Sequence, residues 1–244
     1  MRREGLWPGA TLCVLLGACG GGQGGAGLPQ PTSLSARAIA GEALFHDVSL
    51  SASGRQACAT CHVPERVFTA DPVTDHGLPV PLGGRHVDLP GFRNAPSLVY
   101  AALTPGFFID EGTPTGGFFR DGRASSLAVQ AQQAFVSGFE MAKRDAAEVL
   151  RRLQASSATL ELFTAAFGAG VLADPDATLL AIGEAIAAYE TEAPEFHPFT
   201  SKYDDWLAGA AQLSAAEQRG LALFNNPARA TAPPVIRVSA RATA

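Results

Sequence analysis

The chain has 244 residues, of which 47% are hydrophobic, and it carries a formal charge of -5 at pH 7. A chain of this length can bury a sizeable core in one domain or two, and its mildly acidic balance argues against nucleic acid as a partner. Only two of its four cysteines, Cys58 and Cys61, lie beyond the first 19 residues, so the sequence is not that of a disulfide scaffold.

The first 19 residues have the pattern of a targeting segment. Arg2 and Arg3 precede a short apolar run, and small residues then lead into Cys19. The run is too short to span a bilayer. The pattern predicts a lipoprotein-type signal peptide over residues 1–19, with Cys19 as the lipidated N-terminus and residues 20–32 as a flexible tether. Ordinary secretion with an incidental Cys19 is the alternative. We therefore expect a periplasmic protein whose contact with a membrane is through a lipid anchor only.

A haem-attachment motif follows the first predicted helix. This helix covers residues 34–45 and is opened by Ser33 or Ser35, and a Ser- and Gly-rich loop then leads into Cys58-Ala59-Thr60-Cys61-His62. Two thiols three positions apart, with an imidazole directly behind them, are typical of covalent haem c. The thiols add to the haem vinyl groups, and His62 becomes the proximal ligand of the iron.

Two other readings of this motif are a redox dithiol and half of a zinc site. A dithiol has no use for His62, and the sequence offers no second Cys/His pair to complete a zinc tetrahedron. The motif therefore predicts one covalently bound haem c in this chain. It also agrees with export, which the assembly of c-type haem requires.

The middle of the chain combines loops with helices. Residues 64–117 are dense in Pro and Gly and are predicted to be long loops that wrap a cofactor. An apolar stripe over 127–135 then predicts a helix that is interrupted at Ser137-Gly138.

Helical patterns continue toward the C-terminus. Helices are predicted over 145–153 and 160–167, and Asp174-Pro175 has the form of an N-cap followed by proline at the first helical position. No run alternates with period two. The predicted fold class is therefore mainly α.

The pattern of residues 34–45 recurs over 213–224, where Ser214 and Glu217 form a capping box. A true repeat would lead into a second Cys-x-x-Cys-His motif, and none follows. We hypothesise that a single-base deletion near Ala232 destroyed that motif and truncated the protein. A naturally disordered C-terminal tail is the alternative.

Several stretches of the chain resemble bacterial di-haem cytochrome c peroxidases and their relatives that mature methylamine dehydrogenase, the MauG-like proteins. Besides the haem motif, the matching stretches are Gly41–Asp47, Arg93–Leu98, Asp121–Ala124 and Glu140-Met141. The resemblance implies two cytochrome-c-like α domains with one haem each. It places the first haem domain, with a helical extension, at 33–200, and a truncated start of the second domain at 201–244.

The resemblance also implies an activity and its residues. The family reduces hydrogen peroxide or uses it to oxidise a partner protein, and a small redox protein serves as electron donor or as protein substrate. Gln130 and Glu140 match the catalytic residues of the distal pocket, and the bend at Ser137-Gly138 would bring them together. The alternative makes Gln130 a solvated helix residue and Glu140 a helix-start carboxylate. Arg123 is expected to bind a haem propionate, or else only to hold a helix N-terminus against Asp121.

The sixth ligand of the iron stays open at this point. By resemblance, a displaceable histidine on the loop after the motif makes His86 or His76 the candidates. Met141, His46 and His197 are alternatives, as is an iron without a sixth ligand.

Three features depart from the family pattern. Arg120 stands where the family commonly has a tryptophan that carries electrons between the haems, and the second haem motif is missing. Asn94 matches a ligand of a family calcium site whose other ligands lie in the second domain, and it can equally cap a turn before Pro96. We expect weak turnover as a peroxidase. A mono-haem electron-transfer cytochrome c is the alternative function, and an inactive gene product is a third reading.

Overall fold

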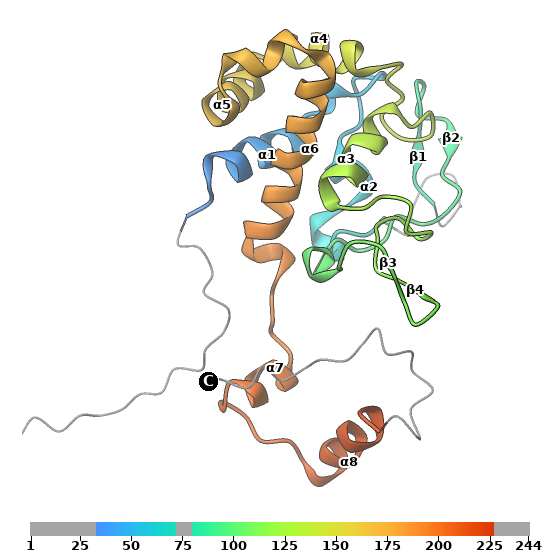
Figure 1. Cartoon of the computed structure of the whole chain (residues 1–244), viewed down its shortest axis with the longest axis vertical. Helices are drawn as coiled ribbons and strands as arrows, with labels where there is room; N and C mark the ends of the chain where they lie inside the picture. The colour runs from blue at the N-terminus through green and yellow to red at the C-terminus, as the bar shows by residue number, and fades with distance from the viewer. Residues whose placement is uncertain (1–32, 72–79, 227–244) are drawn as a thin grey trace, which may run out of the picture.

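The computed structural model describes residues 33–71 and 80–226. Its body is a group of helices around one long central helix, α6 (Pro175–Glu192), which packs against α1 (Ala36–His46), α3 (Leu127–Val136) and α4 (Ala146–Ala155). Figure 1 shows α4 and α5 (Ser157–Phe167) at the upper end of α6. The loop-rich segment lies to the right of α6 in the same view. The prediction of a mainly α fold is confirmed.

Side-chain caps explain where these helices begin. The hydroxyl of Ser35 accepts a hydrogen bond from the backbone N–H of Ala38, and Asp145 caps α4 in the same way. Asp174 caps α6, with proline at its first position, as predicted. Helix α5 begins at Ser157, three residues before the predicted start. The residue before it, Ser156, donates its hydroxyl to Asp47 instead of capping the helix, so the local signal is weak.

The core lies where α1 crosses α6. Phe45 of α1 packs edge-on against Tyr189 of α6, with ring centroids 5.6 Å apart. At Gly41 the two helices approach so closely that a Cβ atom would lie 2.0 Å from the carbonyl oxygen of Ala185. The absence of a side chain at Gly41 therefore allows the crossing. The largest fully buried side chains are Phe45, Phe135, Phe163, Phe196, Leu44, Leu50, Leu153, Ile182 and Ile186.

The segment predicted to be loops contains short regular elements. Strand β1 (Leu82–Gly83) pairs antiparallel with β2 (Leu89–Pro90), and β3 (Phe108–Asp110) pairs antiparallel with β4 (Thr113–Thr115). Strands of two or three residues are too short to show an alternating pattern in the sequence, so the prediction of loops alone was incomplete. The single-turn 3-10 helices in and around this region are η1 (Val48–Leu50), η2 (Pro64–Arg66) and η3 (Ala101–Leu103).

The C-terminal helices lie below the body in Figure 1, beyond the lower end of α6, and an ion pair joins them to each other. Lys202 of α7 (Lys202–Leu207) lies 2.8 Å from Glu217 of α8 (Ala215–Phe224). The capping box of Ser214 and Glu217 is present as predicted, and no residue of α8 is buried. Two further short helices, η4 (Ala169–Ala173) and η5 (Pro194–Phe196), flank α6.

Some predictions fall outside the described residues. These are the signal peptide over 1–19, the tether over 20–32 and the tail around Ala232. The division into domains at residue 200 stays a prediction. Among the residues that the structure does describe, none of the helices has the length and apolar character needed to cross a membrane.

Candidate functional site

The haem-attachment motif forms a single helical turn. Helix α2 (Cys58–Cys61) begins after Ala57, whose backbone N–H donates to the hydroxyl of Thr60 at 2.9 Å. It ends where the N–H of His62 donates to the carbonyl oxygen of Cys58 at 2.8 Å. This compact turn holds both thiols and the imidazole close together, as predicted from their spacing.

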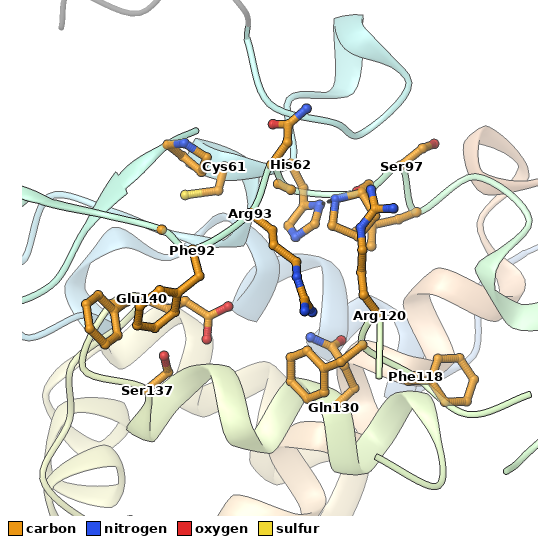
Figure 2. A pocket seen from close by; sticks show the side chains of 18 of the residues that line it. Cys61, His62, Phe92, Arg93, Ser97, Phe118, Arg120, Gln130, Ser137 and Glu140 are labelled. Carbon is orange, nitrogen blue, oxygen red and sulfur yellow. Dashed lines mark hydrogen bonds between the residues drawn. The ribbon is translucent and has the colours of Figure 1, made fainter. Parts of the chain in front are cut away.

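Two cavities meet at this motif. The larger has a volume of about 360 Å³ and the smaller about 70 Å³. Both are lined by Cys61, His62, Leu98, Gln130 and Glu140. Figure 2 shows the side chains of Gln130 and Glu140 turned toward the open space next to His62. The structure therefore brings the two predicted distal residues together with the predicted proximal ligand.

A turn between α3 and α4 carries Glu140 to the cavity. Helix α3 ends at Val136 and is followed by Ser137, whose carbonyl oxygen accepts a hydrogen bond from the N–H of Glu140 at 3.1 Å. Gln130, by contrast, points from α3 itself. The predicted interruption at Ser137-Gly138 is confirmed. The alternative that made Glu140 a helix-start carboxylate is wrong, because Glu140 lies in a turn, and Gln130 is a half-buried residue of α3.

Two neighbouring segments fix this turn from outside. The N–H of Gly84 donates to the carbonyl oxygen of Glu140 at 2.9 Å, and the side-chain amide of Gln56 donates to the same oxygen. At Gly83, in β1, a Cβ atom would lie 2.0 Å from the carbonyl oxygen of Phe139. The β1 hairpin therefore packs directly on the backbone that positions Glu140.

His62 is held in one tautomer. Its Nδ1 atom lies 2.9 Å from the carbonyl oxygen of Phe68 and 3.1 Å from that of Pro96. Carbonyl oxygens only accept hydrogen bonds, so Nδ1 carries the proton and Nε2 is left with a free lone pair. Burial lowers the pKa of His62, although the two backbone hydrogen bonds oppose that shift. A neutral ring with a free Nε2 is the form that binds iron.

The two cysteines are thiols at neutral pH. Burial, reinforced by the nearby charges of Glu190 and Cys61, raises the pKa of Cys58 to about 12. Burial and the charge of Glu140 raise the pKa of Cys61 to about 11. Within the part of the chain that the structure describes, neither forms a disulfide. Redox and zinc chemistry both need thiolates, and these raised pKa values disfavour the thiolate form of both cysteines.

The described residues contain no ready-made site for a metal ion. Across residues 33–71 and 80–226, no group of three His, Cys, Asp or Glu side chains is placed so that it could hold one. The zinc reading therefore gains no support from the described part of the chain.

Three arginines line the larger cavity: Arg93, Arg120 and Arg123. Arg123 is held at the wall, since it pairs with Asp121 at 2.8 Å and its guanidinium lies 3.5 Å above the centre of the Phe119 ring. Figure 2 shows Arg93 extending into the cavity between Glu140 and Gln130. Arg123 alone was expected to bind a propionate, and Arg93 was missed, although Arg93 opens one of the stretches that carried the resemblance.

The candidate sixth ligands are dispersed. His86 is exposed in the β1–β2 turn and lines neither cavity, and His76 lies outside the described residues. His46 is exposed, and His197 bonds through Nε2 to the carbonyl oxygen of Glu190. Met141 is buried and lines the smaller cavity. No pattern in the sequence indicates that the β1–β2 hairpin places His86 at the surface, outside both cavities.

Asn94 lies at the wall of the larger cavity, as an exposed residue in the segment that precedes Pro96. Calcium at this residue stays a prediction.

Two buried polar residues of the smaller cavity were missed in the sequence. Glu190 lies on α6, and Gln56 precedes the haem motif; Glu190 Oε2 and Gln56 Oε1 have no hydrogen-bond partner among the described residues. Glu190 follows Ile186 by four positions, on the apolar stripe of the predicted helix. A carboxylate in such a stripe is the signal that could have identified it.

These residues fit a covalently bound haem. Two neutral thiols, an imidazole with a free Nε2 and cationic side chains suited to propionates surround the same space. The buried polar atoms without partners show that the smaller cavity is built for contents other than hydrocarbon alone.

Comparison with known proteins finds haem-protein relatives over most of the chain. The family model described as di-haem cytochrome c peroxidase matches residues 35–212. The methylamine utilization protein MauG of Paracoccus denitrificans is 41% identical over 216 residues, which are 88% of this chain and 54% of that protein. The cytochrome c peroxidase Ccp of Escherichia coli is 28% identical over 208 residues, 84% of this chain and 38% of that one.

Solved structures agree. The diheme peroxidase BthA from Burkholderia thailandensis matches with a TM-score of 0.67 and 35% identity, covering 82% of this chain and 47% of that one. A MauG-like protein associated with microbial copper homeostasis matches with a TM-score of 0.59 and 28% identity, covering 83% and 52%. The chain spans about half the length of the curated MauG relatives that it matches.

Proposed function

The chain belongs to the di-haem cytochrome c peroxidase family, and from this premise we propose that it is a c-type haem enzyme that reacts with hydrogen peroxide. The reaction either reduces peroxide to water or uses it to oxidise a partner protein. The mono-haem electron carrier is not favoured, because the relatives named above include peroxidases.

We propose that this chain binds one haem. Cys58 and Cys61 add to its vinyl groups, and His62 binds the iron through Nε2. Arg93 and Arg123 are placed to pair with propionates, because both line the larger cavity. When bound, the haem supplies the electrons that reduce peroxide.

Gln130 and Glu140 handle the substrate. Glu140 accepts a proton from one oxygen of hydrogen peroxide and returns it to the other, which then leaves as water. The Gln130 amide donates a hydrogen bond that orients the peroxide. Two electrons and two protons in total convert one peroxide into two waters. The observation that carries this proposal is that both residues line both cavities together with Cys61 and His62.

Location and partners complete the proposal. The protein is exported to the periplasm and attached to a membrane by a lipid on Cys19, as the pattern of residues 1–19 predicts. A small redox protein delivers electrons or is itself the protein that is oxidised. Arg120 cannot carry an electron hole as a tryptophan can, so the donor must approach by another route. We also propose that Asn94 binds a calcium ion.

Stopped-flow mixing of the haem-loaded full chain with hydrogen peroxide tests the assignment. Glu140→Gln is expected to slow the spectral change of the haem about 100-fold or more, the size of effect typical of general acid–base groups. Glu65→Gln, a change of an exposed glutamate beside the motif, is the matched control and should react like the wild type. Equal rates for Glu140→Gln and the wild type, at equal haem content, would contradict the proposal.

A further inference from the structure

Glu190 is a carboxyl group enclosed in the protein without a partner. It lies on α6, its exposed fraction is 4%, and its Oε2 atom has no hydrogen-bond partner within the described residues. The side chain lines the smaller cavity together with Cys58 and Met141. An ionised Glu190 lies close enough to the motif for its charge to raise the pKa of Cys58.

Within residues 33–71 and 80–226, the groups around Glu190 supply no neutralising charge. On the motif side it faces Cys58 and Cys61, whose thiols the attachment of haem would consume, and Glu140 lines the same cavity. Helix α3 contains no ionisable residue.

The charged side chains of the other elements packed on α6 are exposed or interact with groups other than the carboxyl group of Glu190. Arg37 of α1 pairs with Glu184 at the exposed surface, and Glu42 and His46 of the same helix are exposed. From η5, Glu195 accepts the hydroxyl of Tyr189. Just after η5, His197 meets the backbone oxygen of Glu190 rather than its carboxyl group. On α4, Glu148 forms ion pairs with Arg144 and Lys143. The charges of Arg151 and Arg152 on the same helix lie near Lys143 and lower its pKa.

Burial in these surroundings raises the pKa of Glu190 to about 8. In the haem-free protein, burial therefore favours the protonated form of this carboxyl group at neutral pH.

Gln56 supplies the complementary group. Its amide nitrogen donates to the carbonyl oxygen of Glu140, which fixes the orientation of the amide and leaves Oε1 without a donor. A protonated Glu190 can donate and Gln56 Oε1 can accept, and both line the same cavity of about 70 Å³. Buried water of the kind that joins such groups occupies about 10–15 Å³ of such space. A water-linked carboxyl group therefore fits this cavity.

We propose that Glu190 takes up a proton when the haem attached to Cys58 and Cys61 is reduced, and releases it when the haem is oxidised. The inference rests on the proposed haem site. If a small redox protein reduced the bound haem by one electron, Glu190 would bind one proton from the solvent, so that the net charge of the enclosed region would be unchanged. An ionised Glu190 favours the oxidised, more positive iron. The reduction potential must therefore fall as the pH rises through the range in which Glu190 titrates.

Redox titration of the haem-loaded full chain between pH 6 and pH 9.5, followed by haem absorbance, tests this coupling. The potential of the wild type is expected to fall by up to about 59 mV per pH unit near pH 8, the one-electron equivalent of a tenfold change. Glu190→Gln should flatten this dependence. Glu184→Gln, on the same helix but at the exposed surface, should keep it. A slope that is the same in Glu190→Gln and the wild type would overturn the proposal.

Infrared difference spectra of the wild type give a second measurement that needs no folded variant. Reduction near pH 8 should produce the C=O band of a protonated carboxylic acid, and its absence would overturn the proposal. Neither readout uses peroxide. Loss of the pH slope with intact peroxide reactivity would contradict only the role of Glu190. The slope without peroxide reactivity would contradict only the proposed function.

Discussion

The Nδ1 atom of His62 lies 2.9 Å from the carbonyl oxygen of Phe68. The chain achieves this contact with a tight turn in which Val67 and Phe68 both have positive φ values, of 51° and 57°. Non-glycine residues adopt this conformation at a cost, and such strain concentrates at functional sites. Phe68 is nevertheless held in place, since its ring stacks on Phe196 with centroids 4.2 Å apart. The core of the protein therefore sets the orientation of the ring that would bind iron.

This contact predicts the tautomer of His62. In the haem-free protein at neutral pH, the proton should reside on Nδ1 and the lone pair on Nε2, because both neighbours of Nδ1 are carbonyl oxygens. Long-range nitrogen–proton NMR spectra of the imidazole distinguish the two tautomers directly. A ring protonated at Nε2 would contradict the assignment of that atom as the iron ligand.

Gly83 is predicted to control the reactivity of Glu140 from a distance. A methyl group at this position would collide with the backbone of Phe139, so Gly83→Ala should displace the turn that carries Glu140. We expect a loss of stability of about 1–3 kcal/mol and slower reaction with peroxide at unchanged haem content. Thermal unfolding and stopped-flow absorbance measure the two effects.

Gly138→Ala is the matched control for that variant. Gly138 lies in the same turn as Glu140, but a Cβ atom there would meet no atom within 4 Å. Its stability and peroxide reactivity should stay close to those of the wild type. Equal behaviour of the two alanine variants would show that close packing of β1 on the turn does not position Glu140.

Asp47 is predicted to stabilise the fold in its ionised form. It accepts hydroxyl hydrogen bonds from Ser49, Ser156 and Thr159 at 2.6–2.7 Å, and so joins the end of α1 to the start of α5. Burial raises its pKa, but these hydrogen bonds and that of the Ser49 backbone lower it on balance. The folded protein therefore binds this proton less readily than the unfolded chain. The stabilisation is present above pH 3.8 and is lost as the pH falls through the lower, folded value.

Asp47→Ala should accordingly lower the free energy of unfolding by about 2 kcal/mol at pH 7 and by less at acid pH. Urea unfolding at several pH values measures both. Asp88→Ala, which removes an exposed carboxylate, is the control. A loss for Asp47→Ala that is independent of pH down to pH 3 would show that the carboxylate charge is not what stabilises this junction.

Local chemistry explains which parts of the fold were predictable from sequence. Ser35, Asp145 and Asp174 cap their helices through contacts within three residues, so the sequence pattern located those helix starts closely. The start of α5 was misplaced because the hydroxyl of Ser156 makes a tertiary bond to Asp47. Such a contact depends on the packing of α5 near α1 and leaves no local pattern.

The residues of the site also fall into those that could be predicted from the sequence and those that could not. The haem motif follows from spacing along the chain, whereas Gln130 and Glu140 were implied by the family resemblance, and both line the cavities at the motif. Gln56 and Glu190 face the smaller cavity only because α6 packs behind the motif, so spacing could not associate them with it. For His86, the direction of the β1–β2 hairpin decides its exposure, and that direction is set by the packing of Gly83 on Phe139.

The central claim is that Cys58 and Cys61 hold a haem covalently, with His62 as the ligand of its iron. Mass spectrometry of tryptic peptides tests it most directly, because cleavage after Arg55 and Arg66 isolates residues 56–66 with the whole motif. The full chain is expressed with export and c-type haem assembly, and Cys58→Ala/Cys61→Ala serves as the control. We expect the wild-type peptide to carry the added mass of one haem and the control peptide to carry none. A wild-type peptide with two unmodified thiols would contradict the claim.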